Sequence, residues 1–197
     1  HQILEQLQLK LSQMNGGLGL NKSTFLLILK LVNHWDGKME SLVLKVLTIV
    51  RLGAGNVSGR EVSDAHLMAC LDLGIELTGT NAEVAIGQWE YQCFGKGIKA
   101  ADDLWVSRYM LYKIAEEFGV GVNIHPKPKT GDWNGSGMHT NFSNEAMRTA
   151  GSEELYSSVC NKLGEVHEEG IASYGSDNDM RLTGLHETQS IEKFSYG

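Results

Sequence analysis

The chain has 197 residues, with 17 Lys and Arg against 24 Asp and Glu, so its formal net charge is −7 at pH 7. This length is enough for one domain with a hydrophobic core. The basic residues are scattered and form no stripe, which argues against nucleic acid and anionic membranes as partners.

Targeting signals and cysteine usage suggest a cytosolic protein. The longest apolar run, residues 25–32, contains Lys30 and is too short to span a bilayer. No basic start is followed by an apolar core and a small-residue cleavage site. The cysteines, Cys70, Cys93 and Cys160, are odd in number and lack metal-site spacing, which fits a reducing compartment. Because the first residue is His1, we expect that the natural start lies elsewhere.

Residues 1–51 differ in composition from the rest, with thirteen leucines and neither Tyr nor Pro. The spacing of apolar residues predicts an amphipathic helix over residues 2–14. Residues 41–50 are typical of a buried strand or a buried helix, and periodicity does not decide between the two. No chemically active pattern occurs in this segment.

From residue 52 onward, the pattern predicts alternating helices and strands. Helices are expected over residues 61–74, 102–119 and 152–170, and strands over 75–80 and 120–124. In the first helix the inward residues would be Val62, Leu67, Cys70 and Leu71. In the second, Asp102 would cap the start, Gly119 would end the helix, and the recurring apolar residues would be Leu104, Tyr112, Ala115 and Phe118. The order lacks a βαβ rhythm, so we expect an α+β fold with an antiparallel sheet.

Residues 88–92 alternate strictly between polar and aromatic side chains. On a strand, Gln88, Glu90 and Gln92 would share one face, while Trp89 and Tyr91 would share the other. A polar face with a carboxylate suits the lining of a cavity. A solvated strand face is the alternative.

Residues 131–143 combine a glycine-rich turn with a second alternating strand. Glycines allow the backbone to approach a ligand closely. On the strand, His139, Asn141 and Ser143 would share one face, and His139 with glutamates elsewhere could bind a divalent metal. The alternative is a hydrogen-bonded core histidine.

Near the end of the chain, Arg181 could bind a carboxylate with two hydrogen bonds, although a lone Arg is more often in a surface ion pair.

Four motifs together resemble the eukaryotic type of glutamine synthetase. They are GAGNVSGREVSDAH at 53–66, TNAEV and GQWEYQ within 80–92, HPKP and GDWNGSGMHTNFS within 125–143, and RLTGLHET at 181–188. The resemblance runs without a gap from about residue 53 to residue 197. It implies an α+β catalytic domain whose curved antiparallel sheet surrounds a site shared between subunits of a homo-oligomeric ring.

The resemblance also implies an activity. The family uses ATP and Mg²⁺ or Mn²⁺ to join ammonium to glutamate through γ-glutamyl phosphate. Phosphoryl transfer depends mainly on positioning and on offsetting negative charge. By motif, Glu83, Glu90 and His139 resemble metal ligands, and Tyr91, Gln92, Asn141 and Ser143 resemble nucleotide-pocket residues. Asn134 and Gly135 resemble residues that hold the amino end of glutamate, Arg181 resembles the clamp on its α-carboxylate, and Glu187 resembles the flap carboxylate that helps to deprotonate ammonium.

The sequence departs from the family pattern at several points. Ala85-Ile86 replaces the usual Met-Pro, and Cys93-Phe94 replaces part of a Gly-Pro turn, which affects the predicted nucleotide pocket. Residues 1–51 lack the family's Glu-x-Glu pair. We also expect that the downstream segment with two arginines and a metal-binding Glu, and the N-terminal β-grasp domain, are missing.

A shifted reading frame would supply the missing pair. If the third base of each codon is read with the next two bases, residues 20–25 permit Glu-Gln-Glu-Tyr-Phe, 38–40 permit Asn-Gly, and 44–50 permit Gln-Gly-Pro-Tyr-Tyr-Cys. Their order and offsets match the family. We therefore divide the chain into 1–51, a non-matching and frameshifted translation, and 52–197, a partial catalytic domain. Two alternatives are a non-catalytic relative that binds nucleotide or assembles with full-length subunits, and a ligase for another amine.

Overall fold

The computed structural model describes the backbone of residues 24–33 and residues 57–83, 85, 87–131, 133, 135–185 and 188–196. The helix expected over 2–14 and the element expected over 41–50 lie outside these residues. So do Asn134 and Glu187.

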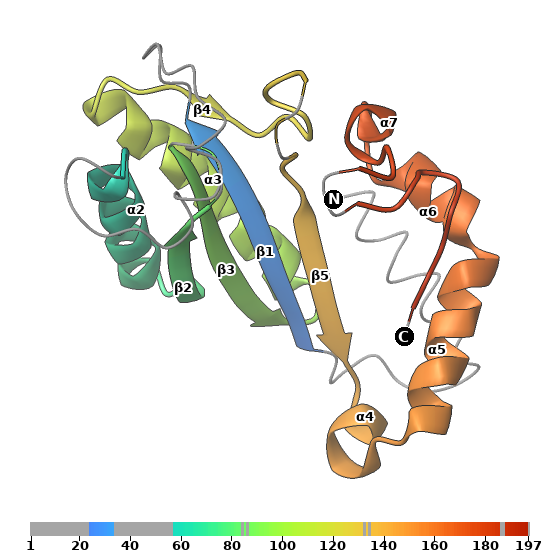
Figure 1. Ribbon diagram of the computed structural model, residues 1–197. Helices are drawn as coiled ribbons and strands as arrows, with labels where there is room; N and C mark the ends of the chain where they lie inside the picture. The colour runs from blue at the N-terminus through green and yellow to red at the C-terminus, as the bar shows by residue number, and fades with distance from the viewer. Residues whose placement is uncertain are drawn as a thin grey trace.

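The described strands form one antiparallel sheet with β1 at its centre. β1 (Thr24–Asn33) pairs along one edge with β3 (Gln88–Lys96), and β3 pairs with β2 (Glu76–Ala82). On its other edge β1 pairs with β5 (Met138–Ser143) and with the short β4 (Val122–Asn123). Figure 1 shows β1 running between β3 and β5. The expected α+β class with an antiparallel sheet is confirmed, and the strand expected over 120–124 is reduced to two residues.

Two helices, α2 (Arg60–Asp72) and α3 (Lys99–Glu117), cover one face of the sheet (Figure 1). The core lies between these helices and β2 and β3. Its buried members include Val62, Cys70, Ile75, Leu77, Trp89, Tyr91, Cys93, Leu104, Leu111 and Ile114. Burial raises the pKa of the Cys70 thiol to about 12 and that of Cys93 to about 11, so both stay protonated at neutral pH.

The ends of α3 agree only in part with the prediction. Its C-terminal stop is confirmed, because Gly119 has φ +65° and the Val120 amide donates to the Ala115 carbonyl at 3.0 Å, as in a Schellman motif. The predicted start at Asp102 is wrong, since the helix begins at Lys99. The close approach of β3 explains this: a Cβ on Gly95 would lie 2.9 Å from the Ala100 Cα, so the chain turns and packs before Asp102.

The predicted inward faces need correction as well. Tyr112 and Phe118 are each 44% exposed, and Leu71 on α2 is 45% exposed. The buried positions of α3 instead follow the 3–4 spacing of Leu104, Ser107, Leu111 and Ile114/Ala115, and include a serine that the apolar pattern does not mark.

A buried polar network joins the two helices to β3. The Ser107 hydroxyl donates to the Leu104 carbonyl at 2.8 Å, so it accepts from the Tyr91 hydroxyl, also at 2.8 Å. His66 Nε2 lies 2.9 Å from the Ser107 carbonyl, and the His66 and Tyr91 rings meet edge to face at 4.7 Å. Burial lowers the pKa of His66, so its ring is neutral at neutral pH.

The C-terminal helices lie beyond β5 (Figure 1). They are α4 (Glu145–Ala150), α5 (Glu153–Glu165), α6 (His167–Ser173) and α7 (Asn178–Arg181). The single helix expected over 152–170 is divided at Val166. The reason is tertiary: His167 Nε2 bonds to the Ile191 carbonyl at 2.8 Å, and the Phe194 ring packs on Gly164.

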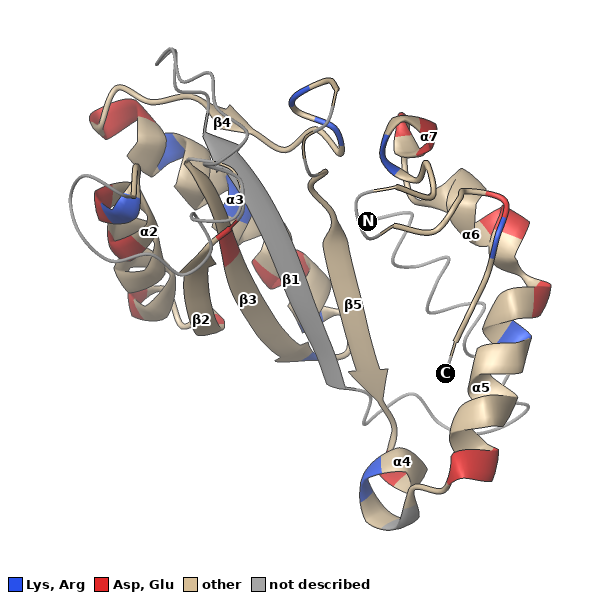
Figure 2. Ribbon diagram, viewed as in Figure 1, with Lys and Arg blue, Asp and Glu red and all other residues tan. Residues whose placement is uncertain are grey.

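The described surface carries both signs of charge. Figure 2 shows acidic and basic residues interspersed over the helices. No helix among the described residues is long and apolar enough to cross a membrane.

Candidate functional site

The pairing register places the predicted site residues of β3 and β5 on one face of the sheet. Ile28 of β1 pairs with Gln92 on one side and with His139 on the other. Because directly paired residues in a sheet share a face, His139 and Asn141 lie on the same face as Glu90 and Gln92. The predicted alternation of residues 88–92 is confirmed. The face is less exposed than a solvated strand, since Gln88 is 1% and Glu90 8% exposed.

The two glutamates are tied to this face by their neighbours. Asn81 of β2 pairs with Glu90 of β3, and its amide donates to Glu83 Oε1 at 3.2 Å. Gln88 reaches from β3 to the glycine-rich segment, where its amide donates to the Gly135 carbonyl at 3.3 Å. The face is thus linked to both chain segments from which other site residues are expected.

The described residues alone do not complete a metal centre. Glu90 pairs with position 30 and His139 with position 28 of β1, so the two lie on opposite sides of that strand. Two interstrand spacings separate their backbones by about 9.5 Å, so an ion held by both side chains would lie over β1. No group of three or more His, Cys, Asp or Glu residues capable of holding a metal occurs among the described residues. β1 itself supplies no carboxylate between them.

The predicted nucleotide-pocket residues are divided between the two faces. Gln92 lies on the polar face, and its Oε1 accepts from Thr78 Oγ1 at 3.3 Å. Asn141 and Ser143 are on the same face of β5, where Arg148 Nη1 donates to Ser143 Oγ at 2.9 Å. Tyr91 lies on the helix side at 2% exposure, so its side chain belongs to the core. A nucleotide-binding role for Tyr91 stays a prediction, which only its backbone could serve in this arrangement.

Arg181 of α7 packs directly against the glycine-rich segment. A Cβ on Gly137 would lie 2.8 Å from both Cζ and Nη2 of Arg181, and one on Gly135 would lie 2.8 Å from its Cγ. These glycines therefore permit the guanidinium to lie flat on the backbone. The Nε of Arg181 is buried and has no hydrogen-bond partner among the described residues. Desolvation lowers the pKa of Arg181, although an arginine remains charged at neutral pH.

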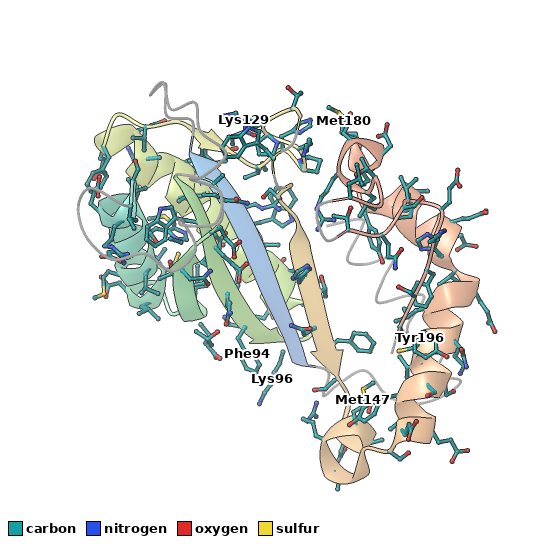
Figure 3. The ribbon with its side chains drawn as sticks, in the orientation of Figure 1. Phe94, Lys96, Lys129, Met147, Met180 and Tyr196 are labelled. Carbon is teal, nitrogen blue, oxygen red and sulfur yellow. The ribbon has the colours of Figure 1, made fainter. Side chains whose placement is uncertain are left out.

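Further cations gather near this contact. Lys127 donates to the Trp133 carbonyl, and Lys129 Nζ lies 3.9 Å from the centre of the Trp133 ring. Figure 2 shows basic residues both on this loop and on α7, and Figure 3 labels Lys129 and Met180 where the loop and α7 come close. Three cations and an unpartnered donor favour an anionic ligand.

Sequence reasoning missed two residues at this junction. His125 Nε2 lies 3.4 Å from Asp177 Oδ2, which joins the segment after β4 to the start of α7. The motifs include His125 only as the first residue of HPKP and do not include Asp177, because a separation of 52 positions leaves no local pattern. The positive φ of Asp177, +63°, is likewise invisible in the sequence.

Comparisons with known proteins agree with the family resemblance of the sequence. Residues 55–172 match the family model described as the glutamine synthetase catalytic domain. Curated relatives named glutamine synthetase match over 149 residues, which is 74% of this chain. They include proteins from Yarrowia lipolytica (53% identical), Fusarium solani subsp. phaseoli (52%) and Saccharomyces cerevisiae (50%).

The chain spans about two-fifths of the length of these relatives, 40% to 41%. The matched region contains β2, β3, α2, α3 and β5 and thus the polar face of the sheet. On this evidence the chain belongs to the glutamine synthetase family and carries part of its catalytic domain.

Proposed function

We propose that these residues serve the ATP-dependent ligation of ammonium to L-glutamate, through γ-glutamyl phosphate, in a protein that assembles into a homo-oligomeric ring in the cytosol. Membership of the family supports the reaction class. The observation that carries the proposal is Arg181, a desolvated cation with an unpartnered Nε among the described residues, held on a backbone that only glycines allow.

A substrate α-carboxylate forms stronger hydrogen bonds with the Arg181 guanidinium than water does. A carboxylate presents two oxygens to the planar fork of a guanidinium, and such charge-assisted bonds are about twice as strong as neutral ones. Gly135 and Gly137 lie against Arg181, and Gly135 and Asn134 would receive the amino end of glutamate. The γ-carboxylate would then point away from Arg181 towards the polar face of the sheet.

The remaining assignments follow the motifs. Gln92, Asn141, Ser143 and Tyr91 would contact ATP, and Glu187 would close over the site and accept a proton from ammonium. Glu83, Glu90 and His139 would help to hold Mg²⁺ or Mn²⁺, which when bound offset the charge on the transferred phosphoryl group. Since the described residues do not complete that centre, further ligands would have to come from other residues.

Isothermal titration calorimetry of L-glutamate binding to the purified chain tests the proposal. The Arg181→Gln variant should bind glutamate about 10- to 100-fold more weakly, because a charge-assisted pair is lost. 4-Aminobutyrate, which lacks the α-carboxylate, should bind neither the unaltered chain nor the Arg181→Gln variant.

Arg108→Gln is the matched control. Arg108 also has a buried Nε without a partner among the described residues, but it lies on α3 and stacks on Trp105. Glutamate affinity should be the same in this variant as in the unaltered chain. Equal affinities of the Arg181→Gln and unaltered chains would contradict the proposal.

A non-catalytic relative is the second candidate, and the composition of β1 favours it for this polypeptide. β1 lies between the strands of Glu90 and His139, yet Thr24–Asn33 contains no acidic residue. A chain with this strand could keep the fold, bind a nucleotide or assemble with full-length subunits.

We further propose that residues 1–51 are, from about residue 15, a frameshifted translation, and that the catalytic-domain sequence begins at about residue 52. The family match that begins at residue 55 supports this boundary. Sequencing of the DNA and transcript for residues 1–60 tests the proposal: the shifted frame should be open and encode Glu-Gln-Glu-Tyr. Stop codons in that frame would refute it.

A further inference from the structure

Helix α7 is docked at both of its ends on one segment of the chain. At its C-terminal end, Arg181 lies on Gly135 and Gly137. At its N-terminal end, the Asp177 carboxylate lies 3.4 Å from His125 Nε2. Because residues 125–137 supply both contacts, the position of one end of α7 constrains the other. Figure 3 shows the side chains of these two segments meeting near Lys129 and Met180.

The hydrogen bonds of His125 fix the tautomer of its ring. The backbone amide of Lys127 donates to His125 Nδ1 at 3.0 Å. Since a backbone amide only donates, Nδ1 is the acceptor, and the ring proton lies on Nε2. The His125 amide in turn donates to Asn123 Oδ1 at 2.9 Å. The ring is therefore oriented by its own segment before it meets the carboxylate of α7.

Asp177 adopts a left-handed backbone conformation, in which glycine is the usual residue. Its φ is +63° and its ψ is +18°, and it is the only non-glycine residue with positive φ among the described residues. Side chains with a Cβ are disfavoured in this region, although Asp and Asn tolerate it better than most. Glycine would form the turn without strain, so the turn does not account for the carboxylate. The carboxylate instead makes two side-chain contacts: its Oδ2 lies 3.4 Å from His125 Nε2 and accepts from the Ser176 hydroxyl at 3.1 Å.

We propose that His125 and Asp177 form a clasp that positions Arg181 for the substrate carboxylate. The inference rests on the proposed role of Arg181. The clasp holds the start of α7 against residues 125–137, and one helical turn later the guanidinium is set on Gly137. His125 and Asp177 are positioning residues: neither contacts the substrate, and each acts through the placement of Arg181.

The test uses five variants of the full chain. His125→Ala removes the donor, whereas His125→Gln keeps an N–H donor on a side chain of similar reach. Asp177→Asn keeps the size and the tolerance of positive φ but removes the charge, and Asp177→Gly removes the side chain while relieving the backbone. Asp179→Asn is the control, because Asp179 is an exposed carboxylate of α7 that is absent from the clasp.

Two measurements are made on each variant. Hydrogen–deuterium exchange of the amides in residues 178–185 reports the docking of α7. Calorimetric titration with L-glutamate and with ADP separates an effect on Arg181 from a general loss of structure. His125→Ala, Asp177→Asn and Asp177→Gly should exchange faster and bind glutamate about 2- to 5-fold more weakly, in line with an exposed contact, with unchanged affinity for ADP. His125→Gln should restore the glutamate affinity, and Asp179→Asn should match the unaltered chain.

The outcomes separate the clasp from the proposed function. Faster exchange with unchanged glutamate affinity would overturn the positioning role and leave a purely structural contact. Parallel losses of glutamate and ADP affinity would also overturn it. An unaltered chain that binds no glutamate would overturn the role of Arg181 itself, and the positioning role with it. Glutamate binding that survives His125→Ala would overturn the clasp alone.

Discussion

Replacement of Trp89 by alanine should lower the free energy of unfolding by about 3–5 kcal/mol. The Trp89 side chain is 4% exposed on the helix side of β3, and its indole N–H donates to the Ser58 carbonyl at 2.8 Å. The Arg60 guanidinium lies 5.1 Å from the ring centre. Truncation would enlarge an existing cavity of about 10 Å³, which Trp89 lines with His66 and Leu111, and would leave the Ser58 carbonyl unpaired.

Unfolding in urea is monitored by the far-ultraviolet circular dichroism signal of the helices. Trp105→Ala is the matched control, because Trp105 lies on α3 with 53% exposure and its loss should cost less than about 1 kcal/mol. A Trp89→Ala variant that unfolds at the same urea concentration as the control would show that the core between the helices and β3 is not arranged as described. Such a result would also remove the support behind Glu90, the next residue on the strand.

Local patterns predicted the elements whose contacts are close in sequence. Strict alternation placed Glu90 and Trp89 on opposite faces of a strand, because side chains alternate in any extended chain. Gly119 marked a helix end, because a left-handed residue is needed there. The inward faces of the helices were predicted less well, since buried His66 and Ser107 are polar and their burial depends on hydrogen bonds to other elements.

Long-range pairing explains what the sequence did not reveal. The apolar run in residues 24–33 has no alternating pattern, and its place between β3 and β5 follows from partners 56–72 and 109–119 positions away. The junction of His125 with Asp177 is equally non-local. The site residues themselves came from motif resemblance, and only the register showed that Glu90 and His139 share a face across an intervening strand.

That intervening strand leads to the second prediction: the purified chain should form no detectable glutamine from glutamate, ammonium and ATP with Mg²⁺ or Mn²⁺. Glu90 lies on one side of β1 and His139 on the other, and β1 contributes no acidic residue between them. An incomplete ligand set binds metal weakly, because each coordinating group must be deprotonated and preorganised. The assay is glutamine formation measured by chromatography, and product above that of the Arg181→Gln variant would refute the prediction.

Placing a carboxylate on β1 should strengthen metal binding. Position 28 pairs with Gln92 and His139, on the face of Glu90, whereas position 29 pairs with Tyr91 and Met138 on the opposite face. Ile28→Glu should therefore raise the affinity for Mn²⁺ by about tenfold, because it adds an oxygen ligand on the strand between those of Glu90 and His139. Water-proton relaxation measures this affinity. Leu29→Glu is the matched control and should instead lower stability without improving Mn²⁺ binding. Equal Mn²⁺ affinities of the two variants would mean that β1 does not separate the two ligand strands in this register, and the reason given for an inactive chain would fail with it.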